Sequence, residues 1–436
     1  MPDPKQIARR IFHETLASID IPRAMERRIN RVGQGISVDG WSCDLTRISD
    51  VKVVALGKAA HPMLSGFVQF FPDLAVTGVA AVPTSSPDPF PGIAYFLGGH
   101  PLPNEDSIRA AQAALALLKT ASQNSLVVFL ISGGGSALME SPLSPEISLD
   151  DIRQLNQLLV TCGASIDGIN TVRKHASAVK GGRLAVASSN AAKLTLAISD
   201  VPLGKESALA SGPTIPDPTT ITDVRRIIDA YHLNEKFPPK VRDWFAAPNL
   251  PETPKRDHPA FANSCFSLLL TSHDLFHAAH HAAESHGFIT CCDNTTDDWP
   301  LDRAADYLLT QLEDLRRANP GQRIALISDG EISSPVTGKG IGGRNSAFVL
   351  ACVEKIAGKS ITVLSAGTDG IDGNSPAAGA IADGTTLARA HALKLAPQDF
   401  FARSDAFSFF AHLGDTLLTG PTGNNLRDLR ILLAHS

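Results

Sequence analysis

The sequence has few cysteines and no long apolar run, and both absences exclude whole classes of protein. Its six cysteines form no C-x-x-C pair and are too sparse for a disulfide scaffold. No apolar stretch approaches the roughly 20 residues of a membrane span. Residues 1–10 are polar and lack the apolar core of a signal peptide. We therefore expect a cytoplasmic protein whose cysteines are reduced.

Neither sign of charge is in large excess. The 39 Lys and Arg residues against 44 Asp and Glu give a net charge of −5, which is too mild to favour a nucleic acid or a membrane surface as partner. A hydrophobic content of 43% is typical of a globular protein, and 436 residues are enough for two domains. We expect a small-molecule substrate and a monomer or homodimer.

Several catalytic motifs are also missing. The sequence contains no G-x-x-x-x-G-K-[ST], no protein-kinase signature and no G-x-S-x-G, which excludes P-loop kinases and nucleophile-elbow hydrolases. One G-x-G-x-x-G match, residues 338–343, begins about nine residues after a predicted strand, so it is a poor dinucleotide fingerprint. We interpret it instead as a mobile glycine loop that presents Lys339 and Arg344 to a phosphate, with a helix N-terminus behind it.

The most informative segment is Ser132-Gly133-Gly134-Gly135-Ser136, directly after the apolar run 126–131. A strand that ends in three glycines leaves backbone N–H groups directed at whatever lies in the loop. This pattern predicts an anion cradle, most plausibly for phosphate. A tight turn without a ligand is the main alternative, because glycine is also the usual residue of strained turns. A serine nucleophile is a weaker alternative.

The same design recurs along the chain and predicts an α/β fold. Apolar runs end in glycine, hydroxyl or charged residues after positions 56, 198, 327, 364 and 418. Predicted strands alternate with helices, which favours two α/β domains with largely parallel or mixed sheets and with ligands beyond the carboxyl ends of the strands. The strands are expected near 51–56, 77–82, 93–97, 125–131, 193–198, 265–271, 287–292, 323–328, 361–366 and 416–419. A phosphate-handling enzyme is the leading hypothesis.

A proline-rich, charged stretch at 245–259 suggests a linker between two domains. We expect an N-terminal domain over residues 1–245 and a C-terminal domain over 260–436.

Cationic side chains are candidates for phosphate binding. Lys58 follows a predicted strand and Gly57, where its amine can reach a bound anion. Arg173 and Lys180 are seven residues apart on a helix predicted over 168–188, so they share one face. A basic helix face is often only solvated, and that alternative stays open.

Carboxylates follow several predicted strands and are candidates for a divalent cation. Asp200, Asp329 and Glu331 lie where few structural roles need a charge, and Mg²⁺ in phosphoryl transfer is commonly held by one or two carboxylates. Asp369 and Asp372 form a further pair, for which an Asx-rich turn is the alternative.

Taken together, these motifs resemble the class II glycerate 2-kinase family, whose C-terminal half is called MOFRL and whose older members carry the label hydroxypyruvate reductase. The resemblance runs from about residue 51 to 433. It rests on LGKAA, GGHPLPNE, ISGGGSAL, INTVRKHASAVKGGRLA, SDVPLGKESALASGPT, SDGE, GGRNSAF, GTDGIDGNSPAAGAI and GPTGNNLRDLRILL, in this order.

The resemblance implies transfer of the γ-phosphoryl group of ATP to D-glycerate, with Mg²⁺ or another divalent cation, giving 2-phosphoglycerate. It implies a Rossmann-like N-terminal domain, a MOFRL-type C-terminal domain and an active site in the cleft between them. The family's cleft lysine and arginine fall on Lys58 and Arg344. Asp200 is implied as a cation ligand or as the base for the glycerate hydroxyl. The predicted ligand-binding residues are Ser132, Gly133, Gly134, Gly135, Ser136, Arg173, Lys180, Gly342, Gly343 and Asp369, and the predicted metal ligands are Asp200, Asp329 and Glu331.

The chain departs from the family pattern at 203–206, 346–347 and Pro376, where acidic residues are expected. Two alternatives therefore stay open. One is an NAD(P)H-dependent hydroxypyruvate reductase, and the other is a catalytically weakened protein that binds glycerate or a phosphosugar.

Overall fold

The structure is a computed structural model that describes residues 3–86, 88–188, 190–201, 204–424 and 426–435. The chain divides into two compact units, residues 21–269 and residues 1–20 with 270–436. We call them the N-terminal unit and the C-terminal unit. Within the described ranges, no helix is both long and apolar enough to cross a membrane.

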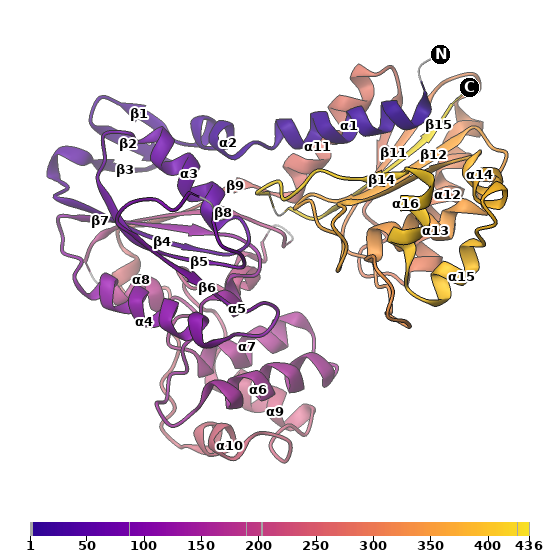
Figure 1. Cartoon of the computed structure of the whole chain (residues 1–436). Helices are drawn as coiled ribbons and strands as arrows, with labels where there is room; N and C mark the ends of the chain where they lie inside the picture. The colour runs from indigo at the N-terminus through magenta and orange to yellow at the C-terminus, as the bar shows by residue number, and fades with distance from the viewer. Residues whose placement is uncertain (1–2, 87, 189, 202–203, 425, 436) are drawn as a thin grey trace. The chain divides into compact units, whose positions relative to one another are not determined.

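This division differs from the predicted boundaries at 245 and 260. Helix α1 (Pro4–Ser18) belongs to the C-terminal unit because its apolar face packs against α11 (Ser272–Ser285), and Lys5 forms an ion pair with Asp415 at 2.7 Å. Figure 1 shows the two helices side by side. The stretch 245–259 is not a linker, since it packs within the N-terminal unit and buries Phe245 and Leu250.

The N-terminal unit is built on a six-stranded sheet whose order is β6-β5-β4-β7-β8-β9. From β6 to β8 the pairs are parallel, as predicted, and the central strands β4, β7 and β8 are mainly apolar and buried almost throughout, as is usual for a parallel sheet covered on both faces. Numbered within the sheet, the order is 3-2-1-4-5-6, the doubly wound arrangement whose direction reverses between β4 and β7. The strands are β4 (Asp50–Leu56), β5 (Val76–Val82), β6 (Ile93–Leu97), β7 (Ser125–Ile131), β8 (Ala192–Ile198) and β9 (Ser264–Leu270).

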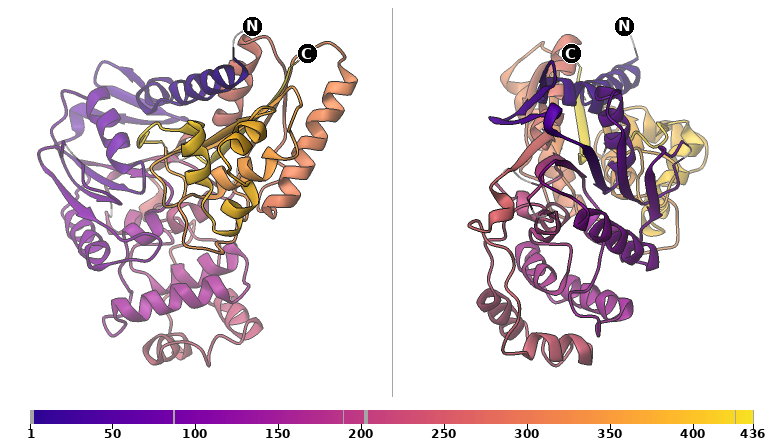
Figure 2. Two further views of the ribbon diagram at one scale, coloured as in Figure 1. Left: turned by 45° about the vertical axis from the view of Figure 1, so that its right-hand side comes forward. Right: turned by 90° about the vertical axis from the view of Figure 1, so that its left-hand side faces the viewer.

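Helices cover this sheet, and further helices form a separate layer. The first group contains α3 (Ala60–Phe70), α4 (Glu105–Lys119) and α8 (Arg183–Ala187); α4 is begun by Asn104, whose side chain accepts from the Ser107 amide at 2.9 Å. A second apolar core joins α6 (Leu149–Thr161), α7 (Ile166–Ala176), α9 (Ile221–Ala230) and α10 (Pro239–Ala246). Figure 2 shows this helical cluster away from the sheet in both views. The remaining elements are α2 (Ile21–Arg28), α5 (Gly135–Leu138) and the antiparallel β1 (Asn30–Val32), β2 (Gly35–Val38) and β3 (Trp41–Asp44).

The C-terminal unit contains a mixed sheet of order β10-β11-β15-β12-β13-β14. Among the described strand pairs of this sheet, β10–β11 alone is parallel; β15 is antiparallel to both β11 and β12. The sequence pattern missed β13 and β15. The strands are β10 (Ile289–Cys292), β11 (Ile324–Asp329), β12 (Ile361–Gly367), β13 (Gly379–Asp383), β14 (Thr416–Leu417) and β15 (Asp428–Ala434), and the further helices are α12 (Leu301–Ala318), α13 (Arg344–Val353), α14 (Thr386–Ala392), α15 (Pro397–Ala402) and α16 (Ala406–Leu413).

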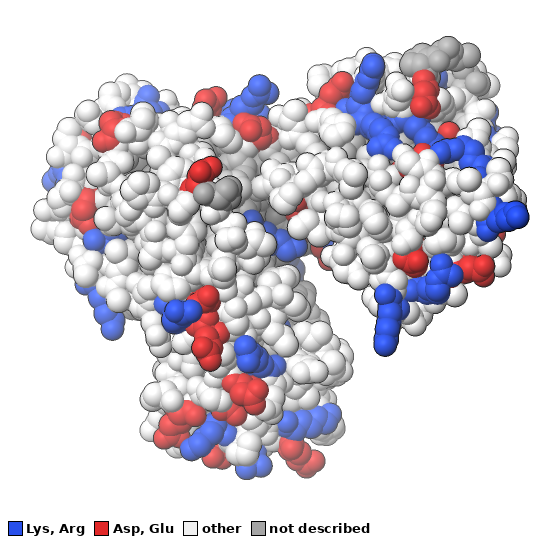
Figure 3. Space-filling model, viewed as in Figure 1, with Lys and Arg blue, Asp and Glu red and all other residues white. Residues whose placement is uncertain are grey.

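Charged side chains are spread over the surface. On the face drawn in Figure 3, positive and negative groups are interspersed on both units, in keeping with the small net charge.

Candidate active site

Two loops meet at the edge of the N-terminal sheet where the strand order reverses. The Ser132 amide donates to the Leu56 carbonyl at 3.0 Å, and the Lys58 amide donates to the Gly133 carbonyl at 2.9 Å. Gly57 has a φ of +120°, and a Cβ there would lie 2.2 Å from the Ser132 Oγ, so no larger residue fits. The glycine loop and Lys58 are therefore held together, as the sequence predicted for the carboxyl ends of neighbouring parallel strands.

The glycine loop keeps backbone donors available. Within the parts of the chain that the structure describes, the amides of Gly133 and Gly134 have no backbone or side-chain acceptor. The Ser132 hydroxyl does have a structural role, since it is buried and accepts from the Ala59 amide at 2.9 Å. These contacts support the anion cradle and give Ser132 the role of fixing the loop.

A cavity of about 440 Å³ opens beside this loop. Arg173 is positioned there by its Nε, which donates to the Asn156 Oδ1 at 2.7 Å. Burial lowers the Arg173 pKa, and the nearby Glu140 carboxylate opposes that shift. The cavity is lined by His100, Pro101, Leu102, Gly134, Ser136, Ala137, Asn156, Gln157, Val160, Thr161 and Arg173.

A chain of side-chain hydrogen bonds supports the cavity wall at Ser136. The Ser211 hydroxyl donates to the Asn170 Oδ1 at 3.0 Å and lies 2.9 Å from the Ser136 Oγ. Ala210 and Ser211 have φ angles of +47° and +60°, a strained conformation for residues with a side chain. Strain of this kind persists only where the surroundings fix the backbone, so the position of Ser136 is well determined.

Lys180 lies elsewhere than predicted, because the helix expected over 168–188 ends at Ala176 and α8 begins only at Arg183. The Lys180 amine forms a buried ion pair with Glu140, which also accepts from the Ser177 hydroxyl at 2.6 Å. Burial lowers the Lys180 pKa. The structure thus gives this charge an internal partner, and Arg173 is the residue of the pair that lines the cavity.

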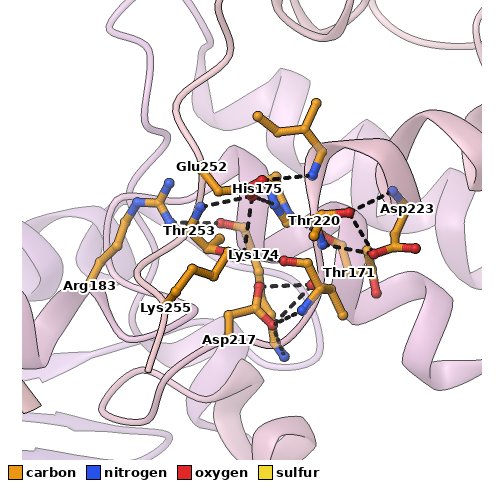
Figure 4. A network of polar contacts seen from close by, with 12 residues as sticks. Thr171, Lys174, His175, Arg183, Asp217, Thr220, Asp223, Glu252, Thr253 and Lys255 are labelled. Atoms are coloured by element: carbon orange, nitrogen blue, oxygen red, sulfur yellow. Dashed lines mark hydrogen bonds and ion pairs between the residues drawn. The ribbon is translucent and has the colours of Figure 1, made fainter. Parts of the chain in front are cut away.

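The other cations of this segment also have carboxylate or carbonyl partners, as Figure 4 shows. Lys174 binds Asp217 at 3.2 Å, and the His175 Nε2 lies 2.8 Å from a Glu252 oxygen. These contacts tie α7 to the loops around 217 and 252, and they indicate a structural role for most of the basic residues in the motif.

Asp200 follows β8 at the same edge of the sheet and is partly buried. It is not among the described residues that line the cavity. Its predicted roles as cation ligand or base stay predictions.

In the C-terminal unit, polar loops also gather at one sheet edge. Strands β11 and β12 both run antiparallel to β15, so their carboxyl ends lie where β15 begins with Asp428. The Arg344 guanidinium binds Asp428 through Nε and a Glu331 oxygen through Nη1 at 2.7 Å. Burial opposes the charge of Arg344, but these two carboxylates raise its pKa overall. Asp369 also follows β12 at this edge, and its Oδ1 accepts from the Ile371 amide at 3.0 Å.

The carboxylate of Asp329 is the least satisfied polar group at this edge. It is completely buried, and neither oxygen has a hydrogen-bond donor in the described parts of the chain. Arg427 lies 3.9 Å away, but its guanidinium binds Asp297 more closely, at 2.6 Å. Burial raises the Asp329 pKa to about 6, against the attraction of Arg427.

The glycine loop before α13 does not offer its amides to a phosphate. Asp372 caps the helix, since its oxygens accept from the amides of Gly343 (3.1 Å), Asn345 and Ser346 (both 2.9 Å). The Gly342 amide donates to a side-chain oxygen of Asn374 at 2.8 Å. The predicted phosphate site at this helix N-terminus is therefore contradicted, because a carboxylate already occupies it.

This loop is also better anchored than predicted. The amides of Gly338 and Gly340 donate to the Ser404 Oγ (3.2 Å) and the Arg403 carbonyl (3.0 Å). Between the loop and the connection of α15 to α16 lies a cavity of about 340 Å³. Its walls are mainly apolar and include Phe400 and Phe401, with Gly342, Gly343 and Arg344 at its edge.

The predicted metal ligands do not form a prepared set. Asp200 belongs to the N-terminal unit, whereas Asp329 and Glu331 belong to the C-terminal unit, where Glu331 already binds Arg344. Among the described residues, no group of three or more His, Cys, Asp and Glu side chains is arranged to hold a metal ion.

Sequence reasoning missed two residues of the N-terminal site. His100 and Ser211 were read only as parts of the motifs GGHPLPNE and SALASGPT. The available signal for His100 was a histidine that follows a predicted strand, 93–97, at the carboxyl edge of the sheet.

Comparisons with known proteins agree with this architecture. A family model described as a domain of unknown function, DUF4147, matches residues 7–246, and the MOFRL family model matches residues 324–428. A glycerate 2-kinase from Pyrococcus horikoshii is 33% identical over 100% of this chain and 98% of its own. A protein from Agrobacterium vitis, provisionally named hydroxypyruvate reductase, is 34% identical over 98% of this chain and 94% of its own. The crystal structure of glycerate kinase from Thermotoga maritima matches with a TM-score of 0.83 and 31% identity over 99% of each chain.

Proposed function

The chain belongs to the DUF4147 and MOFRL family that includes glycerate 2-kinases, and we propose that it transfers the γ-phosphoryl group of ATP to D-glycerate, giving 2-phosphoglycerate. One observation carries the proposal: Lys58 and a glycine loop with open amides lie together at the switch point of the sheet, beside a cavity edged by Arg173. Phosphoryl transfer depends mostly on positioning and charge neutralisation, and these groups supply both.

The two substrates of the proposed reaction differ in shape, and so do the two cavities. We assign the carboxylate of glycerate to Arg173 in the 440 Å³ cavity, because a guanidinium forms strong charge-assisted bonds to carboxylates. We assign the nucleotide to the 340 Å³ cavity, whose exposed Phe401 suits a flat base and whose Arg344 suits a phosphate. The interdomain location of the reaction stays a prediction from the family resemblance, as does the cytoplasmic location of the protein.

A divalent cation fits the donors that are present. Mg²⁺ usually keeps several water ligands and binds through one or two carboxylates together with substrate phosphates. Asp329 supplies one such carboxylate, since neither of its oxygens has a hydrogen-bond donor in the described residues, whereas the roles of Asp200 and Glu331 as ligands stay predictions. When bound, the cation would neutralise phosphate charge.

The reductase alternative finds little support in the geometry. The turn after β4, the first strand of the doubly wound sheet, reads Gly57-Lys58-Ala59-Ala60 and lacks the dinucleotide fingerprint. The G-x-G-x-x-G match lies in the C-terminal unit, where its amides already have acceptors.

The acidic residues expected from the family pattern are absent, but local structure is regular at those positions that the structure describes. Leu203 lies outside the described residues, but Ser346 and Ala347 sit in the first turn of α13, where the Ser346 hydroxyl donates to Asp372 at 2.6 Å. A protein that binds glycerate or a phosphosugar without turnover is the second candidate, favoured only by those absent acids.

Two substitutions test the site. Lys58→Ala and Arg344→Ala should each lower turnover of ATP and D-glycerate by at least about tenfold, roughly 1.4 kcal/mol in the barrier. Circular dichroism and thermal unfolding check that each variant is folded. Arg109→Ala, on the exposed side of α4, and Lys359→Ala, on the exposed surface of the C-terminal unit, serve as matched controls for the loss of a positive charge. Near-wild-type rates in both test variants would remove the assignment.

A further inference from the structure

We propose that His100 is the catalytic base that accepts the proton of the acceptor hydroxyl during phosphoryl transfer; this inference rests on the proposed function. His100 lines the 440 Å³ cavity together with Arg173 and Ser136. Its ring lies against the glycine loop, since a Cβ on Gly134 would be 3.2 Å from the His100 Cδ2, 3.4 Å from its Nε2 and 3.4 Å from the Lys58 Cγ. One small region thus joins the anion cradle, the cradle's lysine and an imidazole.

Among the described residues that line this cavity, His100 is the one side chain that can accept a proton near neutral pH. The other ionisable group in the lining, Arg173, is a permanent cation. Glu140, the carboxylate that acts on the charge of Arg173, is buried and binds Lys180 and the Ser177 hydroxyl, so it has its own partners. The remaining lining side chains are apolar, hydroxyl or amide groups.

The surroundings keep His100 neutral at physiological pH. Burial lowers its pKa below the ordinary 6.5, and the positive charge of Lys58 lowers it further. Arg173, on helix α7, lines the same cavity and also carries a positive charge. A neutral imidazole has a lone pair available for a proton, which an imidazolium lacks.

No protein group in the described residues is hydrogen-bonded to the His100 ring, which distinguishes it from two other histidines of the unit. His175 is held between the Thr171 carbonyl at 2.9 Å and Glu252 at 2.8 Å. His61 lies 2.9 Å from the Tyr95 hydroxyl and also contacts Ser86. His100 instead lines a cavity beside the anion cradle, where its ring nitrogen can exchange a proton with a bound substrate.

The step is balanced with the substrates of the proposed reaction. The hydroxyl oxygen of the acceptor forms a bond to the γ-phosphorus of ATP while the bond from that phosphorus to the β–γ bridging oxygen breaks. The electron pair of the broken bond leaves with ADP. The hydroxyl proton passes to the His100 Nε2 and from there to solvent as products depart.

The test is the pH dependence of kcat for ATP and D-glycerate. For the wild type we expect activity to fall as the pH drops through a value below 6.5, because protonated His100 cannot act as the base. His100→Gln should lower kcat by about a hundredfold or more and abolish this acidic limb. Imidazole in solution should restore part of the activity of His100→Ala. His61→Gln is the matched control and should keep the wild-type profile.

The outcomes separate this inference from the proposed function. If the wild type forms no phosphoglycerate, the proposed function fails. If the wild type is active but shows no acidic limb below 6.5, the base assignment is overturned even if the variants do not fold. An unchanged limb in folded His100→Gln would overturn it as well.

Discussion

Replacing Asp329 by asparagine should stabilise the C-terminal unit at neutral pH. The wild-type carboxylate is buried without a hydrogen-bond donor, so ionising it in the folded protein is unfavourable. Asparagine has nearly the same shape and mimics the protonated form. Arg427 keeps its ion pair with Asp297 in the variant, so no new unpaired charge is left behind.

The magnitude follows from the pKa. Burial raises the Asp329 pKa from 3.8 to about 6. Because the folded-state pKa of this acid lies above the unfolded one, stability is fully present below about pH 4 and is lost as the pH rises through about 6. A shift of roughly two units corresponds to about 3 kcal/mol at neutral pH. The stabilisation by Asp329→Asn should therefore be small near pH 4 and approach that value near pH 8.

Urea unfolding near these two pH values is the assay. The two units can unfold separately, so the signal must report on the C-terminal unit alone. The chain has three tryptophans, and of these only Trp299 lies in that unit. A background with Trp41→Phe and Trp244→Phe makes the fluorescence of Trp299 specific.

Asp383→Asn is the control of opposite sign for this prediction. Asp383 is partly buried in the C-terminal unit and its Oδ1 accepts from the Thr385 amide at 2.9 Å; burial opposes its charge, but the Thr385 hydrogen bonds and the charge of Lys5 lower its pKa overall. Its replacement should therefore destabilise the unit at neutral pH, by about 1 kcal/mol, the usual scale for a lost hydrogen bond. An Asp329→Asn variant that is no more stable than the wild type near pH 8 would refute the reasoning.

Two further predictions concern the N-terminal unit and the substrates. Lys180→Met and Glu140→Gln should each destabilise the protein by about 3–5 kcal/mol, because each leaves a buried partner unpaired, and the double variant should lose less than their sum in urea unfolding; additive losses would show that the pair is not coupled. Arg173→Ala should raise the KM for D-glycerate about tenfold or more with little change for ATP, the scale of a lost charge-assisted hydrogen bond, whereas Phe401→Ala should raise the KM for ATP; steady-state kinetics with the opposite pattern would reverse the substrate assignment.

The parallel sheet of the N-terminal unit was predictable because short sequence patterns specify its strands. Strands such as β4 and β7 are mainly apolar and lead into glycine loops, and parallel pairing brings their carboxyl ends to one edge. That placement brought Lys58 next to the glycine loop. The strand bounds differ from the predicted ones by at most a few residues for the same reason.

The features that could not be predicted depend on contacts between residues that are far apart in the sequence. Strand β15 follows a loop that contains glycines, and charged residues stand at 427, 428 and 430, so the sequence there does not show the apolar pattern of a strand. Arg430 is nevertheless buried, and its guanidinium donates to the Gly330 carbonyl at 2.7 Å. Lys180 and Glu140 are 40 residues apart in the sequence, so no local pattern predicts their buried ion pair.

The same limit applies to the loop before α13. Its glycines and the following helix resemble a phosphate site in sequence. The capping carboxylate of Asp372 comes from a segment 29 residues beyond Gly343, and only the folded chain brings the two together.

The most direct measurement of the central claim is to incubate the purified protein with ATP, Mg²⁺ and D-glycerate and to identify the product by ³¹P NMR, with NADH and hydroxypyruvate in a parallel reaction. The account predicts a 2-phosphoglycerate resonance and no NADH oxidation. NADH oxidation without phosphoryl transfer would contradict it in favour of the reductase. Stabilisation of the fold by glycerate without any turnover would contradict it in favour of a binding protein.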